Sequence, residues 1–169
     1  RDIGNIDEYV RAHNDILEGK VAISCPNERI EGDGMTLCRG RDVQVAADVE
    51  FKGMVMLGNN CRIGEGSRLT NSIIGDQVVI GEKAVITDSV IWSDTVIEPL
   101  VSVSSSIITH RVIVGRGASV LDRAVIADDC RIGSSARIKA NCKIWPGKIV
   151  DDGATVSSSI VWGEKWNRE

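Results

Sequence analysis

Histidine is the side chain of this sequence best suited to acid–base chemistry, and the 169 residues contain only two, His13 and His110. A zinc site built from histidines alone needs three of them, so the two present exclude it. His110 could act as a general base. In the repeat described below it points outward, and the repeat leaves no room for an inserted loop to enclose it. We keep His110 as a catalytic candidate and expect no catalysis by this chain alone.

Cysteine is the second reactive residue type, and the chain has five without a Cys-x-x-Cys pair. An odd number at this spacing favours a reducing, cytoplasmic compartment over a disulfide framework. Cys61, Cys130 and Cys142 fall on small inward positions of the repeat, where we expect buried, unreactive thiols. Cys25 and Cys38 lie in a less regular segment and receive no role.

Charge and hydropathy exclude two classes of partner. The net charge is −4, with acidic and basic residues interspersed and no basic block, so we expect no nucleic-acid partner. No apolar run reaches the ~18 residues of a membrane helix, and no signal peptide is present. Hydrophobic residues make up 43% of the chain but aromatic residues only 4%, so the core must be aliphatic.

An aliphatic residue recurs at steps of six residues, with occasional steps of five, through most of the chain. Only Phe51 departs from the aliphatic type. This ladder consists of Val45, Phe51, Leu57, Ile63, Leu69, Ile74, Ile80, Ile86, Ile91, Ile97, Val103, Ile108, Val114, Val120, Ile126, Ile132, Ile138, Ile144, Val150, Val156 and Val161. The residue after a ladder position is often glycine, which we interpret as a need for a backbone conformation that a Cβ hinders.

The five-residue steps indicate a coil with three faces. They end at Ile74, Ile91, Ile108 and Val161, which are separated by multiples of three ladder positions. A triangular coil that loses one residue at one corner explains this spacing. A period of six fits neither a helix nor simple alternation and indicates short strands separated by turns. The sequence therefore predicts an all-β parallel β-helix of about seven coils stacked ~4.8 Å apart.

The residues before the ladder are expected to form a short helix and a connection. Asn5 and Glu8 make a capping box, and Gly19 ends the segment. One face of the helix over 5–18 is apolar; it consists of Tyr9, Val10, His13, Ile16 and Leu17. We therefore divide the chain into a helix that ends a preceding domain (1–20), an irregular linker that caps the first coil (21–44), the β-helix (45–162) and a tail (163–169).

The repeat resembles the hexapeptide-repeat family. About twenty hexads in register approximate its motif [LIV]-[GAED]-x-x-[STAV]-x, and single hexads match it fully at Ile63–Arg68 (IGEGSR) and Ile132–Arg137 (IGSSAR). Prisms of that family are left-handed. The resemblance therefore implies a left-handed β-helix, whereas the general rule for parallel crossovers favours the right hand.

The start of the chain resembles the end of the catalytic domain of sugar-1-phosphate nucleotidyltransferases. That family has the motif W-x-D-[IVT]-G-T, then a helix, then in many members a left-handed β-helix. Here Arg1–Asn5 (RDIGN) precedes Tyr9, Ala12 and Leu17. The resemblance implies a fragment of a longer protein that begins after the motif Trp. Asp2 takes the place of the family's metal-ligand Asp, and Asn5 replaces its usual Thr.

The same resemblance implies cofactors and partners for the parent protein. Mg²⁺ is expected as its cofactor, whereas this fragment holds too few ligands to bind the ion alone. Ile144–Lys148 (IWPGK) and Ser159–Gly163 (SIVWG) further resemble mannose-1-phosphate guanylyltransferase-like proteins. Some of those proteins continue into a phosphomannomutase domain, so we expect an upstream nucleotidyltransferase domain and consider a downstream phosphomannomutase domain.

Three of the four tryptophans follow ladder residues of one face. Trp92, Trp145 and Trp162 should line one edge of the prism, where an outward aromatic column would favour a contact surface of a homo-oligomer. The alternative is that Trp162 and Trp166 merely cap the last coil.

Three functions stay open at this point. The first is an accessory oligomerisation or regulatory domain, not catalytic itself, of an enzyme that joins a nucleoside triphosphate to a sugar 1-phosphate and releases pyrophosphate. GTP and mannose 1-phosphate are its best-guess substrates. The alternative is a hexapeptide-repeat acyltransferase that uses acetyl-CoA and His110. The third is a non-catalytic relative, as in translation-factor subunits with this architecture. The sequence leaves open the oligomer's symmetry and any allosteric ligand.

Overall fold

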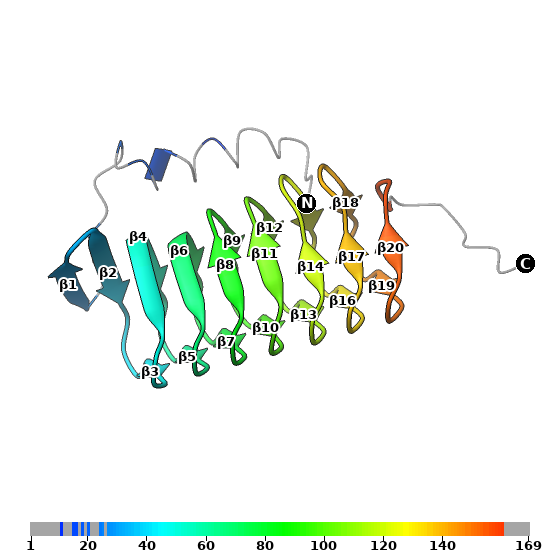
Figure 1. Cartoon of the computed structure of the whole chain (residues 1–169). Helices are drawn as coiled ribbons and strands as arrows, with labels where there is room; N and C mark the ends of the chain where they lie inside the picture. Colours follow the sequence, from blue (N-terminus) through cyan, green and yellow to red (C-terminus); the bar gives the residue numbers. More distant parts are fainter. Residues whose placement is uncertain are drawn as a thin grey trace, which may run out of the picture.

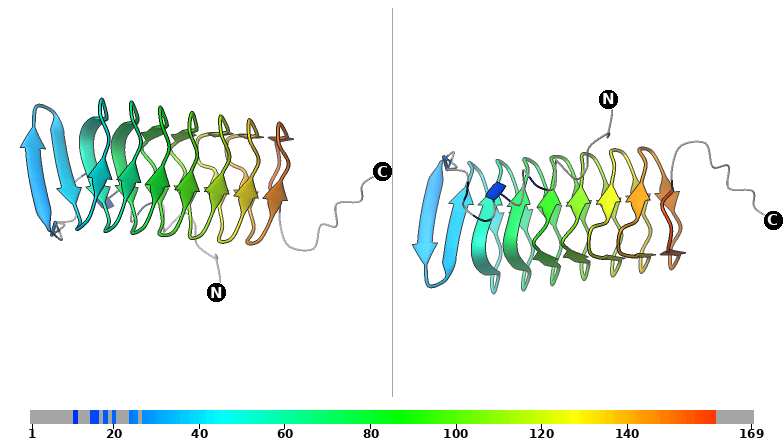
Figure 2. Two further views of the ribbon diagram at one scale, coloured as in Figure 1. Left: turned by 90° about the horizontal axis from the view of Figure 1, so that it is seen from below. Right: turned by 90° about the horizontal axis from the view of Figure 1, so that it is seen from above.

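The computed structural model describes residues 27–160, together with residues 11, 15, 16, 18, 20, 24 and 25. The described chain is a stack of coils with strands on three faces, and the coils follow one another along a single axis (Figure 1). Two further views show the same regular spacing from either side (Figure 2). No helix in these residues is long and apolar enough to cross a membrane.

The first face is a seven-stranded parallel sheet. Its strands are β3 (Gln44–Val45), β5 (Arg62–Ile63), β7 (Val79–Ile80), β10 (Val96–Ile97), β13 (Ile113–Val114), β16 (Arg131–Ile132) and β19 (Ile149–Val150).

The second and third faces join into one 13-stranded sheet, because β4 (Glu50–Leu57) and β6 (Arg68–Ile74) run around the corner between them. The second face continues through β8 (Val85–Thr87), β11 (Ser102–Ser104), β14 (Ser119–Val120), β17 (Arg137–Ile138) and β20 (Thr155–Val156). The third face contains β2 (Met35–Arg39), β9 (Val90–Ile91), β12 (Ile107–Ile108), β15 (Val125–Ile126) and β18 (Lys143–Ile144).

The predicted ladder points into the prism. From Leu57 to Val156 every ladder residue is buried and belongs to one continuous core. Only the first coil is more open, with Val45 37% exposed and Phe51 half-buried. The all-β parallel β-helix predicted from the six-residue period is confirmed.

The last ladder step differs from the prediction. Ile160 pairs with Ile144 and is buried, so Ile160 takes the place expected for Val161. The corner is shorter because the Lys143 N–H donates to Ser159 Oγ at 2.9 Å, which draws Ile160 into the ladder one residue early. The five-residue step to Val161 is therefore wrong, and Val161 and Trp162 lie outside the described residues.

Corners of the prism use the left-handed backbone region. Among the described residues, fifteen that are not glycine have φ between 44° and 64°, and Asp and Asn account for eight of them. These two residue types tolerate this region best after glycine. The positive φ follows the ladder glycines by two residues, as at Asn60 after Gly58.

Glycine is needed after ladder positions because successive coils approach each other closely there. The sequence-based interpretation, a backbone conformation that a Cβ hinders, is therefore corrected. A Cβ on Gly58 would lie 2.6 Å from the backbone carbon of Gly75 in the next coil. On Gly64 it would lie 2.6 Å from the backbone nitrogen of Glu82.

The five-residue corners are held by buried serines. The Ser89 N–H donates to Ser72 Oγ at 3.3 Å, and the Ser106 N–H donates to Ser89 Oγ at 3.1 Å. Each serine is at most 2% exposed. A buried hydroxyl needs such partners, which explains why the corners at Ile74, Ile91 and Ile108 share a serine two residues before the ladder.

Residues 21–44 are more regular than expected. β1 (Glu28–Gly32) and β2 form an antiparallel hairpin, and β2 pairs in parallel with β4. The unpaired edge of β4 provides the template for this pairing. The expectation of an irregular segment is therefore wrong for residues 28–39.

Cys25 and Cys38 form a disulfide with their Cα atoms 5.2 Å apart. This corrects the expectation of a chain without disulfides. The expected helix over 5–18 falls mainly outside the described residues, of which Arg11, Asp15 and Ile16 have helical backbone.

Leu100 offers a test of the corner geometry. It has φ 64° and is 46% exposed. Leu100→Gly should raise the free energy of unfolding by about 0.5–1 kcal/mol, because relieving about 1–2 kcal/mol of left-handed strain outweighs the added unfolded-chain entropy. Urea unfolding measures this. The control Val79→Gly, in an exposed strand position, should lower the same free energy. Equal losses in both variants would contradict the strain argument.

Candidate functional site

His110 lies in a corner between the third and first faces, at a position where side chains of successive coils form a column. Oxygen atoms in this column accept a backbone N–H from the preceding coil: Arg41 donates to Asn59 Oδ1 at 2.8 Å, and Asn59 donates to Asp76 Oδ1 at 2.7 Å. The His110 N–H donates to Asp128 Oδ1 at 3.0 Å in the same way. Stacking of coils therefore places a carboxylate directly beside His110.

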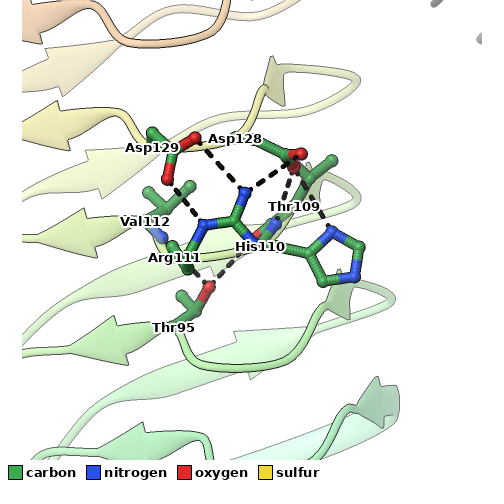
Figure 3. A network of polar contacts seen from close by, with 7 residues as sticks. All are labelled: Thr95, Thr109, His110, Arg111, Val112, Asp128 and Asp129. Atoms are coloured by element: carbon green, nitrogen blue, oxygen red, sulfur yellow. Dashed lines mark hydrogen bonds and ion pairs between the residues drawn. The ribbon is translucent and has the colours of Figure 1, made fainter. Parts of the chain in front are cut away.

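The His110 ring contacts two further groups. Its Nδ1 lies 3.3 Å from Asp128 Oδ1, and its ring stacks on Trp92 with centroids 5.5 Å apart (Figure 3 shows the carboxylate contact). The His110 side chain is 41% exposed. Such a pair could orient the imidazole for general-base chemistry.

Arg111 ties the same corner to the next coil. Its Nε donates to Asp129 Oδ1 at 2.7 Å, and its Nη2 lies 3.6 Å from Asp128 Oδ2 (Figure 3). The hydrogen bond to Asp129 raises the pKa of Arg111 and lowers the pKa of Asp129. These exposed groups strengthen the corner only modestly.

Asp128 is held in its charged form. Burial by itself would raise the pKa of Asp128, but hydrogen-bonding groups of Thr109 and His110 together outweigh it and lower the pKa. The buried Thr109 hydroxyl has no hydrogen-bond partner within the described part of the chain. The His110 N–H, which donates to Asp128 Oδ1 at 3.0 Å, is the formed hydrogen bond that favours the Asp128 charge.

His110 and Asp128 lie outside the hollow of the first face. A shallow, open hollow of about 460 Å³ lies on the first face around Arg62, Val79, Glu82 and Pro99, and neither His110 nor Asp128 lines it. The His110–Asp128 pair alone supplies a proton acceptor but no walls that would orient a substrate.

Metal binding was predicted only for the parent, through Asp2, which lies outside the described residues. Within the described residues, no group of three His, Cys, Asp or Glu side chains could hold a metal ion. We therefore derive no step that uses Mg²⁺.

Two members of the predicted tryptophan column, Trp92 and Trp145, lie within the described residues. Trp92 and Trp145 both follow ladder residues of the third face, three coils apart. Trp92 is half-buried and packs on a second hydrophobic cluster, whereas Trp145 is 38% exposed. Trp162 is not described. Their role in a subunit contact stays a prediction.

The three free cysteines behave as expected. Cys61, Cys130 and Cys142 are at most 2% exposed, and burial raises the pKa of each thiol. Cys61 Sγ donates to the Gly75 carbonyl at 3.0 Å. A raised thiol pKa suppresses the nucleophilic thiolate.

Sequence reasoning missed Asp128 as the partner of His110. The two residues are 18 positions apart, and only the stacking of coils joins them. Aligning the coils at their ladder positions would have placed both in one column.

The parallel coils, the inward aliphatic ladder and the left-handed corner residues define a β-helix of hexapeptide repeats. Residues 36–138 match the family described as EIF2B subunit epsilon LbH domain, where LbH denotes the left-handed β-helix. The match covers more than half of the chain, and the chain belongs to this family.

Individual relatives agree with this assignment. The chain is 35% identical over 104 residues to bifunctional protein GlmU of Synechococcus elongatus, and equally to GlmU of a second Synechococcus strain. The alignment covers 62% of this chain and 19% of GlmU, so the chain spans about a fifth of these relatives. This likeness supports the predicted kinship with nucleotidyltransferase-linked β-helices.

Solved structures show the fold. UDP-N-acetylglucosamine acyltransferase from Campylobacter jejuni superposes with a TM-score of 0.63 at 18% identity, over 77% of this chain and 66% of that protein. The same enzyme of Francisella novicida gives a TM-score of 0.50 at 18% identity, over 73% and 55%. Identities this low carry no argument about activity.

Asp128→Asn tests the electrostatics of the corner. A lowered folded-state pKa gives stability that is present above the ordinary carboxyl pKa of about 3.9 and is lost as pH falls through the folded-state value. The variant keeps the corner hydrogen bond, as Asn59 does, and loses only the charge. We expect lower stability than the unmodified chain at pH 7 and a difference that shrinks toward pH 3, measured by urea unfolding. Asp48→Asn, at another exposed corner, is the control. A difference independent of pH would refute the assigned charge effect.

Proposed function

We propose that this chain is an accessory domain, without catalysis of its own, that holds the subunits of a sugar-nucleotide-forming nucleotidyltransferase together. Membership of the EIF2B subunit epsilon LbH family and the GlmU relatives support a kinship with the accessory domains of such enzymes. The observation that carries an assembly role is the outward side of the first face. Four of its seven outward positions are aliphatic: Val79, Val96, Ile113 and Ile149.

These aliphatic side chains remain accessible. Val79 is 38% exposed and Ile149 is 71% exposed. The outward positions of the second face contain a single aliphatic residue, Val85, among polar ones. An apolar stripe of this kind on a rigid prism favours contact with another protein surface. It adjoins the corner that carries Trp145, and the outward Arg131 lies between Ile113 and Ile149 within it.

The parent enzyme would join a nucleoside triphosphate to a sugar 1-phosphate and release pyrophosphate, with Mg²⁺ as cofactor. GTP and mannose 1-phosphate remain our proposed substrates, from the resemblance of the two ends of the chain. An upstream nucleotidyltransferase domain, a downstream phosphomannomutase domain and a cytoplasmic location belong to the same proposal. The Cys25–Cys38 disulfide is the observation that weighs against a reducing compartment.

The acyltransferase alternative is favoured by one observation. Asp128 lies beside His110 Nδ1, which leaves Nε2 as the nitrogen that would accept a proton from an acyl acceptor. The bond formed would join the acceptor to the acyl carbon, with the thiol of coenzyme A as leaving group. The His110 side chain is 41% exposed and lies outside the hollow of the first face.

Light scattering separates the two proposals. We expect a defined oligomer whose mass is unchanged by GTP, GDP-mannose or acetyl-CoA. Val79→Glu combined with Ile149→Glu should dissociate it, because a carboxylate would be desolvated in the contact. Val85→Glu, on the second face, should not.

A monomeric unmodified chain would overturn the assembly role. Saturable acetyl-CoA binding, together with acyl transfer that His110→Ala abolishes, would instead establish the acyltransferase.

A further inference from the structure

A second apolar stripe lies on the outward side of the third face. Met56, Ile73, Val90, Ile107 and Val125 occupy matching positions in five successive coils, as the strand registers show. We call these five residues the outer stripe. At ~4.8 Å per coil it extends for ~19 Å along the prism.

Three of the five residues of the outer stripe are buried, whereas Met56 and Ile73 are half-buried. Val90, Ile107 and Val125 are 3%, 5% and 6% exposed, whereas the outward valines Val79 and Val85 on the first and second faces are each 38% exposed. The three buried residues form a hydrophobic cluster separate from the core. Ile73 and Trp92 pack against this cluster, and the exposure of only a few per cent of all three residues calls for a further cover on the face.

We propose that the amphipathic segment 5–18 of this same chain is the occupant of the outer stripe. The disulfide supplies the first argument. Cys38 pairs in register with Met56, so it stands directly in line with the stripe. Its bond to Cys25 therefore brings the chain to the first coil of the stripe, and the preceding residues start from there.

The described residues of segment 5–18 support a helix that turns its apolar face toward the outer stripe. Asp15 and Ile16 are half-buried although they precede the prism, whereas Arg11 and Glu18 are exposed. Helical spacing places Ile16 on the apolar face, and Arg11, Asp15 and Glu18 on the opposite side. Lys20 lies 3.3 Å from Asp15 and pairs with Glu18, which keeps the polar side together.

The expected length of the helix also agrees with the length of the outer stripe. A helix over 5–18 would be about 21 Å long, close to the ~19 Å of the outer stripe. The eight residues from Leu17 to Cys25 reach at most about 28 Å, which is enough to place the helix over the central coils.

The docked helix would fix the direction in which the chain enters the prism. If the proposed function holds, the domain before residue 5 is then joined to the prism through an extended packed contact rather than a flexible linker. The prism would set the relative orientation of those domains in the assembly, and this consequence alone rests on the proposed function.

Hydrogen exchange of the full chain tests the docking. Amides of 5–18 should be protected in the unmodified chain. Ile107→Ser combined with Val125→Ser should raise their exchange rates, and tryptic cleavage after Arg11, at least about tenfold. Leu17→Ser should do the same from the other side of the contact. The control, Val85→Ser on the second face, should leave both rates unchanged.

Exchange within the prism reports whether the variants remain folded, and it should not change. Unprotected amides over 5–18 in the unmodified chain would overturn the proposal. So would dissociation of an oligomer by the Ile107→Ser and Val125→Ser pair, because a second copy would then cover the stripe. Loss of the oligomer only in Val79→Glu with Ile149→Glu concerns the proposed function and leaves the docking untouched.

Discussion

Backbone hydrogen bonds from each coil to the next hold this protein together, and they require every coil to keep the register of its neighbour. Ile113 donates to the Cys130 carbonyl at 3.1 Å and Gly115 to that of Ile132 at 2.8 Å, each one coil further along. The corners meet this requirement by left-handed residues and by glycines such as Gly58, where a Cβ would strike the following coil. The aliphatic core then fills the space that the register defines.

Once the register is fixed, the three faces differ only in what they present outward. The second face is mostly polar, the first exposes aliphatic side chains such as Ile149, and the third has a covered stripe around Ile107. The corner at His110 adds a histidine and a carboxylate outside the hollow of the first face. This distribution suits a protein that organises other domains through its surfaces, as proposed, more than one that encloses a substrate.

The sequence predicted the parts that repeat. A ladder from Leu57 to Val156 is a local pattern, so its period revealed the coils, their faces and the buried cysteines. It could not reveal Asp128 beside His110, because their contact depends on the stacking of two coils. Ile160 replaced Val161 because a single hydrogen bond at Ser159 shortened a corner. The hairpin over 28–39 follows no hexapeptide pattern and arises from the free edge of β4.

Residue-resolved hydrogen exchange along the prism tests most directly whether each coil depends on its neighbours. The account predicts one continuous profile with the slowest amide exchange in the central coils, around residues 80–132, and a gradual rise toward both ends. An abrupt change at a coil boundary, with blocks on either side opening independently, would contradict it.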